Sequence, residues 1–426
     1  MSLATLEALR QGALAGAREL RLGGCGLTEF PAEIFGLAET LEVLDLGSNA
    51  LSHLPDDLGR LRRLRVIFCS GNRFERLPPS LADCAALSQL GFRGTGMREV
   101  PAEALPAGLR WLTLTDNDIQ ALPAALGQLS ALQKLMLSGN ALRELPTGLA
   151  AAPALELLRI AANRFEGLPP WLEEHPALAW VAWAGNAFDR MAAPAARLIP
   201  WRDLTLGPLL GQGASGLVHQ ALWREAPGAA PRPVALKLFK GAMTSDGLPA
   251  QEMAACLAAG GHPALVGAIG RVDDHPEGAD ALVMPLLAPH WRALAGPPSL
   301  ESCTRDVYDP ALRLDGPAAL RIARQVAGAA AHLHGRGVLH GDLYAHNILW
   351  DGAAGEAALS DFGAACRMPA PQSLQRIEAR AFGILLGELA ACTPDAPPAL
   401  REVAALCTQP RPGKRPSMAE ITRLLA

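Results

Sequence analysis

A sequence frame of the form L-x-L-x-x-N recurs through the first 190 residues at a nearly constant spacing. Its last position falls at Cys25, Asn49, Asn72, Thr95, Asn117, Asn140, Asn163 and Asn186. Successive copies are therefore 24, 23, 23, 22, 23, 23 and 23 residues apart, which is too regular to arise by chance. Such a period leaves few folds open, because each copy must be one structural unit that stacks on its neighbours.

Each copy of the frame predicts one short strand followed by a turn. In Leu44-x-Leu46-x-x-Asn49 the two leucines point inward and the residue between them points outward, because side chains alternate along a strand. The asparagine lies where the chain turns away, and a buried amide there must hydrogen bond to neighbouring backbone. A second apolar cluster, which includes Leu54 and Leu58, covers the other side of the core. One copy cannot bury its own apolar face, so we expect the copies to share a continuous core.

This frame resembles the leucine-rich repeat family over residues 17–190. The resemblance implies an α/β solenoid domain over residues 1–200, with a helix at Thr5–Ala15 capping the first repeat and Ala187–Leu198 capping the last. Thr95 stands where asparagine is usual, and we expect it to weaken that repeat. An array of this kind presents a face to a partner and carries out no chemistry itself.

Strand alternation places one set of side chains on the concave face of the solenoid. Four of them are large and apolar, and we expect them to form an exposed trail that binds a protein substrate or regulator. They are Phe68, Trp111, Met136 and Trp180. The alternative is that another part of the chain or a second subunit covers the trail.

A second group of residues with a chemical pattern lies between Val338 and Gly363. Three apolar pairs predict short buried strands around a loop: Val338-Leu339, Ile348-Leu349 and Ala358-Leu359. Asn347 follows Asp342 by five residues, and Asp361 follows Asn347 by fourteen. Phosphoryl transfer needs such a set, with one acid to orient a hydroxyl group and an amide plus a second acid to hold Mg²⁺. The alternative is a loop whose acids only cap turns.

The same stretch resembles the catalytic loop of the protein kinase family, in the run H-G-D-L-Y-A-H-N, and its metal-binding segment, in D-F-G. The resemblance runs over residues 203–426 and implies an α+β two-lobed domain over residues 201–426. It assigns Asp342 as the catalytic base, and Asn347 and Asp361 as the ligands of Mg²⁺.

Three glycines at G-x-G-x-x-G spacing occupy residues 211–216. Glycines let a hairpin turn lie close over phosphates and donate backbone N–H groups to them. A dinucleotide-binding fold would open a helix at the third glycine, whereas residues 217–222 alternate like a strand. The next strand reads V-A-L-K and ends at Lys237, and a helix over Pro249–Ala259 carries Glu252 fifteen residues later.

By resemblance to protein kinases, Lys237 contacts the ATP phosphates and Glu252 holds Lys237. A carboxylate that is merely solvated on its helix is the alternative for Glu252. The residues implied to bind ATP are Gly211, Gln212, Gly213, Ala214, Ser215, Gly216, Val218, Ala235, Lys237, Glu252, Met284 and Leu287.

Several positions depart from the protein-kinase pattern. Gly341 replaces the arginine that pairs with a phosphorylated activation segment in that family. Sixteen residues separate the aspartate of D-F-G from Glu378, and Ala370-Pro371-Gln372 is the nearest trace of the A-P-E motif. Arg415 thereby loses the glutamate that it usually pairs with. Tyr344 stands where serine/threonine kinases carry lysine.

These features predict an ATP- and Mg²⁺-dependent protein kinase that phosphorylates serine or threonine in a protein bound by the repeats. Two alternatives remain open. The form H-G-D-x-x-x-x-N also occurs in aminoglycoside phosphotransferases and related small-molecule kinases. A pseudokinase scaffold acting through the repeats is the other.

Charge and cysteine usage narrow the class of partner and the compartment. The net charge of −4 is small against 38 basic and 42 acidic residues, and basic residues form no block, so we expect no nucleic-acid partner. The eight cysteines are scattered without C-x-x-C spacing and predict free, mostly buried thiols of a reducing compartment. The first residues lack the basic start of a signal peptide, and no apolar run has membrane-spanning length, so we expect a cytoplasmic protein that does not enter a membrane.

Overall fold

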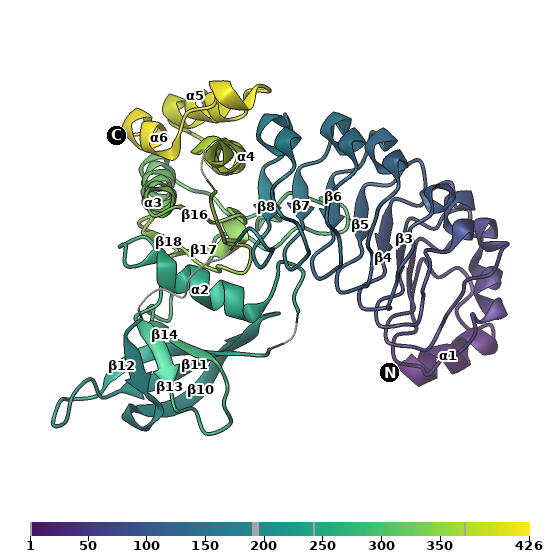
Figure 1. Ribbon diagram of the computed structural model, residues 1–426, viewed down its shortest axis with the longest axis horizontal. Helices are drawn as coiled ribbons and strands as arrows, with labels where there is room; N and C mark the ends of the chain where they lie inside the picture. The colour runs from purple at the N-terminus through teal and green to yellow at the C-terminus, as the bar shows by residue number, and fades with distance from the viewer. Residues whose placement is uncertain (1, 190–195, 242, 370–371) are drawn as a thin grey trace. The chain divides into compact units, whose positions relative to one another are not determined.

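A computed structural model describes residues 2–189, 196–241, 243–369 and 372–426. Residues 1–177 and 178–426 form two compact units (Figure 1). The first is a solenoid of parallel strands, and the second combines sheets with helices, so both expected fold classes are confirmed. The second unit begins ahead of residue 200, where the sequence analysis places the domain boundary.

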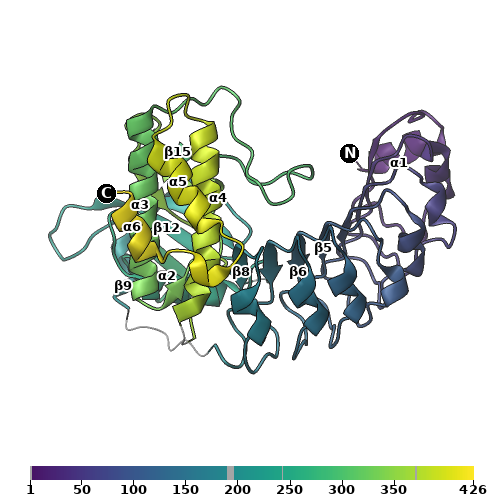
Figure 2. The ribbon, with the colours of Figure 1, turned by 90° about the horizontal axis from the view of Figure 1, so that it is seen from above.

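Strands of three residues line one side of the first unit, and each pairs in parallel with the next along the chain. They are β1 Glu19–Arg21, β2 Val43–Asp45, β3 Val66–Phe68, β4 Gln89–Gly91, β5 Trp111–Thr113, β6 Lys134–Met136 and β7 Leu157–Arg159. A short 3₁₀ helix follows each strand and covers the other side of the core (Figure 2). These are η1 Ala32–Leu37, η2 Leu58–Arg60, η3 Pro79–Asp83, η4 Ala102–Ala104, η5 Ala124–Gln128, η6 Thr147–Ala151 and η7 Pro170–Glu174.

The frame asparagines are largely buried and bind neighbouring backbone, as predicted. Asn72 shows the pattern: its Nδ2 donates to the carbonyl of Leu46 at 2.9 Å, and its Oδ1 accepts the N–H of Leu51 at 2.9 Å. Both the hydroxyl and the N–H of Thr95 donate to Oδ1 of Asn117 at 2.9 Å. The repeat that contains Thr95 therefore still hydrogen bonds to the next repeat.

A helix caps the N-terminal end of the solenoid, but its predicted bounds are wrong. Helix α1 spans Ser2–Arg10 instead of Thr5–Ala15. Turns follow it, and Gly12 adopts a left-handed φ of 73°, which a continuing helix does not allow. Half of the cap predicted at Ala187–Leu198 lies outside the described residues, and its last residue begins strand β9, Leu198–Pro200.

The concave trail is only partly open to solvent. Phe68 is half-buried, and a Cβ added to Gly91 on the next strand would come within 2.6 Å of the Phe68 ring. Trp111 is also half-buried, with its Nε1 donating to Oγ1 of Thr113 at 2.8 Å. The ammonium of Lys134 lies 4.0 Å from the centre of the Trp111 ring.

For Met136 and Trp180 the predicted exposure is wrong. Met136 is 7% exposed, and its sulfur lies 3.6 Å from Oγ1 of Thr113 on the neighbouring strand. Strands less than 5 Å apart let side chains on one face cover each other. Trp180 is 1% exposed and belongs to the second unit, where the ring of Tyr344 covers it.

The second unit contains a six-stranded sheet in the order β10-β11-β12-β14-β13-β9. The strands are β9 Leu198–Pro200, β10 Leu204–Gln212, β11 Gly216–Trp223, β12 Arg232–Phe239, β13 Gly270–Asp273 and β14 Ala281–Pro285. The edge strand β9 was not predicted; it pairs in parallel with β13 and buries Ile199 in the core of this sheet. Helix α2, Pro249–Ala259, has the predicted bounds and ends at Gly260, where φ is 66°.

The rest of the second unit is mainly helical, and its long helices lie side by side in Figures 1 and 2. They are α3 Gly316–Gly335, α4 Gln375–Ala391, α5 Pro398–Cys407 and α6 Met418–Leu424. The shorter elements are β8 Trp180–Ala182, β15 Arg292–Ala293, β16 Val338–Leu339, β17 Ile348–Trp350, β18 Ala357–Leu359, β19 Cys366–Arg367, η8 Trp201–Asp203, η9 Ala345–Asn347, η10 Gln372–Leu374 and η11 Pro412–Lys414. Strands β16, β17 and β18 confirm the three apolar pairs. The loop between β16 and β17 carries Asp342 and Asn347, and Asp361 follows β18.

Helix α3 delivers the chain to β16 and the loop after it. It begins where the side chain of Asp315 accepts the N–H of Ala318 at 2.7 Å, a hydrogen bond that satisfies a free donor of the first turn. Ile322, Val326 and Leu333 are buried on one face. Because that face is packed, the start of the following loop is fixed in place.

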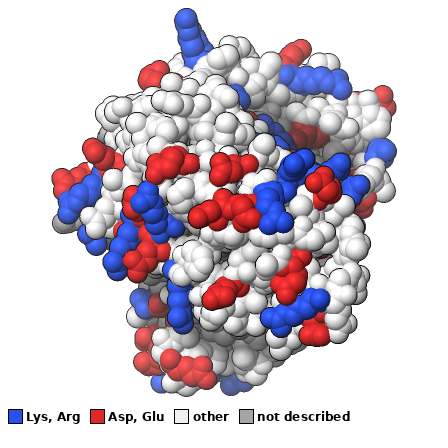
Figure 3. Space-filling model, turned by 90° about the vertical axis from the view of Figure 1, so that its right-hand side faces the viewer, with Lys and Arg blue, Asp and Glu red and all other residues white. Residues whose placement is uncertain are grey.

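All eight cysteines are free thiols and six are buried, as expected of free, mostly buried thiols. None of the helices in the described ranges is both long and apolar enough to span a bilayer. Acidic and basic side chains are interspersed on the face shown in Figure 3. That face therefore carries no extended field of one sign.

Candidate functional site

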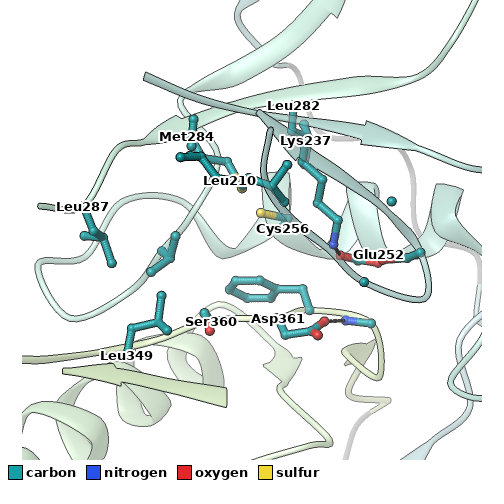
Figure 4. Close-up of a pocket in the computed structure, with 18 of the residues that line it drawn as sticks. Leu210, Lys237, Glu252, Cys256, Leu282, Met284, Leu287, Leu349, Ser360 and Asp361 are labelled. Atoms are coloured by element: carbon teal, nitrogen blue, oxygen red, sulfur yellow. Dashed lines mark hydrogen bonds and ion pairs between the residues drawn. The ribbon is translucent and has the colours of Figure 1, made fainter. Parts of the chain in front are cut away.

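A cavity of about 550 Å³ opens in the second unit (Figure 4). Strands β10, β11, β12 and β14, together with α2, supply one wall, and the opposite wall comes from β17 and residues 360–363. The volume is in the range of sites for nucleotide-sized molecules. Eleven of the predicted residues line it: Gly213, Ala214, Ser215, Gly216, Val218, Ala235, Lys237, Glu252, Met284, Leu287 and Asp361.

The glycine-rich turn joins β10 to β11 over this cavity. The N–H of Gly213 donates to the carbonyl of Gly216 at 3.0 Å and closes the turn. A Cβ on Gly216 would lie 2.5 Å from the carbonyl oxygen of Leu238, so a glycine is needed there. Gly211 and Gln212 are in β10 and do not line the cavity.

Lys237 and Glu252 form an ion pair inside the cavity, as Figure 4 shows. Their side chains are 14% and 5% exposed. Burial raises the pKa of the Glu252 carboxyl, while the Lys237 ammonium opposes that rise. A lysine held in this way presents one positive charge at a defined point of the wall.

Apolar side chains surround the remaining space, mostly on the side away from this ion pair. Met284 and Leu287 were predicted to lie here, and Leu349 faces them from β17. Among the lining residues that sequence reasoning missed are Leu210, Thr244, Asp246, Cys256, Leu282, Leu349 and Ser360. The apolar run of β17 was a usable signal for Leu349, whereas no pattern pointed to Thr244 or Cys256.

Asp342 and Asn347 lie together in the loop after β16, although neither lines the cavity itself. Nδ2 of Asn347 donates to Oδ2 of Asp342 at 2.8 Å and to its carbonyl oxygen at 2.9 Å. The N–H of Ser360 donates to the carbonyl of Asn347 at 2.8 Å, which places this pair beside the segment that carries Asp361. Asp361 is exposed at the cavity, has a left-handed φ of 60°, and accepts the N–H of Gly363 at 3.0 Å.

The buried side chains of Glu378 and His340 hold the loop after β16 in place. Oε1 of Glu378 accepts the N–H of Gly341 at 2.8 Å, and its Oε2 lies 2.6 Å from Nε2 of His334. Burial opposes ionisation of Glu378, but the hydrogen bonds from His334 and Gly341 outweigh it and lower the pKa of the carboxyl. His340 lies 3.0 Å from the carbonyl oxygen of Ser360 through Nε2, so its contact is with backbone.

His346, to which the sequence assigned no role, is bound to Asp306. Its Nδ1 lies 2.7 Å from Oδ1 of Asp306, and its N–H donates to Oδ2 at 3.1 Å. Burial disfavours the imidazolium, yet the hydrogen bond to Asp306 and the charge of Asp342 raise the pKa of His346. Sequence reasoning left residues 288–315 unassigned, so it had no partner to offer this histidine.

Arg415 binds backbone carbonyl groups in place of the A-P-E glutamate with which it usually pairs in protein kinases. Its Nε donates to the carbonyl of Gln409 at 2.8 Å and its guanidinium to that of Arg376 at 3.2 Å. Burial lowers its pKa to about 10. Ala370 and Pro371, the trace of the A-P-E motif, lie outside the described residues.

The donor set at the cavity fits Mg²⁺ bound together with phosphates. Nδ2 of Asn347 is used by Asp342, so its amide oxygen is the atom that would face a metal, and Asp361 supplies a carboxylate. Magnesium prefers oxygen ligands and is often held by one or two protein groups plus substrate phosphates. In the described ranges no three His, Cys, Asp or Glu side chains form a group that could hold a metal ion alone.

Comparison with known proteins agrees with both parts of the chain. Residues 204–385 match the family of protein tyrosine and serine/threonine kinases, and residues 15–74 and 107–165 match the leucine rich repeat family. Mouse podocan is 35% identical over 111 residues, which is 25% of this chain and 18% of podocan. Mouse vasorin is 32% identical over 124 residues, covering 28% of this chain and 18% of vasorin.

The chain thus spans less than a fifth of the length of either curated relative. Among solved structures, a leucine-rich repeat protein of Leptospira interrogans is 24% identical, with a TM-score of 0.37. That match covers 42% of this chain and 52% of the Leptospira chain.

Proposed function

Because this chain joins a leucine-rich repeat region to a protein-kinase domain, we propose that it transfers the γ-phosphate of ATP to serine or threonine hydroxyls of a protein bound by its repeats. The observation that carries the proposal is the arrangement of charges around one cavity. Lys237, paired with Glu252, and Asp361 both line that cavity, and Asp342 lies bound to Asn347 in the adjoining loop.

Different parts of the cavity wall would bind the adenine ring and the phosphates of ATP. Apolar side chains such as Val218, Met284 and Leu349 suit the adenine ring. The backbone of residues 213–216 and the ammonium of Lys237 suit the phosphates. Asn347 and Asp361 would hold Mg²⁺, which when bound neutralises charge on the transferring phosphate.

Asp342 is the group proposed to act on the acceptor hydroxyl. Its carboxylate is partly exposed, and Asn347 holds one of its oxygens at 2.8 Å. The other oxygen would accept a hydrogen bond from the hydroxyl and orient its lone pair toward the phosphate. Catalysis by this chain then consists of positioning and electrostatic stabilisation.

The concave face of the repeats is the proposed docking surface for the protein partner. Phe68 and Trp111 remain half-exposed there, beside Lys134. Aromatic side chains of this kind carry much of the free energy of protein–protein binding. The eight free thiols support the reducing cytoplasm as the compartment in which this happens.

A small-molecule kinase is the second candidate, and two sequence features favour it. Gly341 stands in H-G-D as it does in aminoglycoside phosphotransferases, and only sixteen residues lie between Asp361 and Glu378. So short a segment leaves little chain for the usual platform that docks a peptide.

One assay separates these candidates. The purified full chain is incubated with Mg²⁺ and γ-labelled ATP, with generic proteins in one mixture and small hydroxyl compounds in another, beside Asp361→Asn. We expect label on serine or threonine, lost in the variant and located by mass spectrometry. Label on a small compound would instead establish the second candidate. ATP binding with no transfer to any acceptor would favour a scaffold that works through its repeats.

A further inference from the structure

Strand β8 packs directly against the loop that carries Asp342 and Asn347. The ring of Trp180 stacks on that of Tyr344 with centroids 4.2 Å apart and planes 7° from parallel. Nε1 of Trp180 donates to the carbonyl oxygen of Leu343 at 3.1 Å. Trp180 is 1% exposed, so both contacts are dry and their geometry is well defined.

The same strand also holds the segment that follows D-F-G. Nε1 of Trp183, which comes directly after β8, donates to the carbonyl oxygen of Arg367 at 2.9 Å. Arg367 is in β19, which pairs with β16 just before the catalytic loop. Strand β8 and the residue after it are therefore bound both to the loop that carries Asp342 and Asn347 and to the segment that follows Asp361.

Gly341 is what lets the strand come this close. Its φ is 76°, and a Cβ on it would lie 2.4 Å from the carbonyl oxygen of Val181 and 2.5 Å from that of Ala364. Both contacts are with backbone, which cannot move aside as a flexible side chain could. Any larger residue at position 341 would have to displace β8 or the segment after D-F-G.

Two further side chains contact the stacked pair of Trp180 and Tyr344. The guanidinium carbon of Arg305 lies 5.5 Å from the centre of its ring, and the ring of His346 lies 5.0 Å from that of Tyr344. The tryptophan thus contacts both a cation and an aromatic ring, and both kinds of contact favour one orientation of the indole. A side chain fixed in this way can hold the loop beneath it.

We propose that Trp180 is a positioning residue for phosphoryl transfer: by stacking on Tyr344 and binding Leu343 it holds the loop that orients Asp342 and Asn347. The inference rests on the proposed function for its chemistry. It makes β8 a built-in support for the catalytic loop, at the place where Gly341 replaces an arginine. A displacement of about 1 Å in such a loop costs about 10²-fold in rate.

The test compares Trp180→Ala with Trp180→Phe, which keeps an aromatic ring but loses the Nε1 donor. Trp171→Ala is the matched control, because Trp171 is a half-buried tryptophan in η7. Measurements on the full chain are kcat, KM and Kd for Mg²⁺-ATP, and hydrogen exchange of the amides at 343–347. We expect Trp180→Ala to lower kcat about 10²-fold with KM and Kd within about threefold, and to speed exchange in that loop. Trp180→Phe should recover most of kcat, and Trp171→Ala should match the wild type.

Two results would overturn the proposal. One is a kcat for Trp180→Ala within about twofold of the wild type with unchanged exchange. The other is a parallel loss of kcat and ATP affinity that Trp180→Phe does not relieve, which is the mark of general unfolding. A wild-type chain that transfers no phosphate would refute the proposed function, whereas the exchange comparison would still show whether Trp180 holds the loop.

Discussion

The two sides of the catalytic loop differ in how far they follow the protein-kinase pattern. Toward the cavity, the expected charged and amide groups are present: Lys237 pairs with Glu252, and Asp342 binds Asn347. On the opposite side, Gly341 and Tyr344 depart from the pattern, and strand β8 packs against them. Chemistry with phosphates restricts one side to a few residue types. The other side only has to be held still, which many kinds of packing can do.

The largest effect expected on the cavity side comes from Lys237→Ala. Removing the one ammonium that Glu252 holds in the wall should lower kcat/KM by about 10³-fold, since a preorganised charge at a developing anion is usually worth 10²- to 10³-fold. Steady-state kinetics would measure it, with the exposed Lys414→Ala as control. A loss of tenfold or less would mean that this side of the loop does not face the phosphates.

Gly341→Ala tests the opposite side through stability. The new Cβ would meet two carbonyl oxygens and hold alanine at a left-handed φ, so we expect a loss of about 3–5 kcal/mol. Denaturant unfolding of the full chain would measure it. Gly335→Ala is the control, because nothing lies within 4 Å of a Cβ there. If the two variants were equally stable, β8 could not lie where the contacts to Gly341 require.

A smaller effect is expected on the pH dependence of stability, and it comes from Glu388. Tyr308 donates to Glu388 at 3.1 Å, near the Asp306 that binds His346. Burial, with the charge of Asp306, raises the pKa of Glu388 from 4.5 to about 7. The folded chain therefore binds more protons than the unfolded chain between these values, and its stability should fall as pH rises from about 4.5 to about 7.

Glu388→Gln should remove that fall, which amounts to roughly 2–3 kcal/mol by the usual conversion of a pKa shift. Thermal unfolding of both chains at pH 5 and pH 8 would show it. His346 contributes in the same direction, because its raised pKa adds stability at low pH that is lost as pH rises through the folded-state pKa. Identical pH profiles for the two chains would show that Glu388 is ionised in the folded state.

Local pattern was enough to predict most of the framework. The 23-residue period identified the parallel strands, and the apolar pairs around the loop became β16, β17 and β18. The bounds of α2 were readable because Pro249 begins it and Gly260 ends it. Lys237 and Glu252 were paired in advance only through the resemblance to protein kinases, and the ion pair confirms that pairing.

Contacts between distant parts of the chain could not be predicted from the sequence. Alternation correctly placed Trp180 on one face of its strand, but the period of a strand does not say what covers that face. Tyr344 covers it, 164 residues later in the chain. Asp306 was missed for the same reason, since its partner His346 lies 40 residues away.

The central claim is that Asp342, held by Asn347, acts on the acceptor while the opposite wall binds ATP. Single-turnover transfer from γ-labelled ATP by the wild type and by Asp342→Asn, with Kd for Mg²⁺-ATP measured on both, tests it most directly. We predict that Asp342→Asn binds ATP within about threefold of the wild type and transfers phosphate at least about 10³-fold more slowly. Equal transfer rates at equal affinity would contradict it.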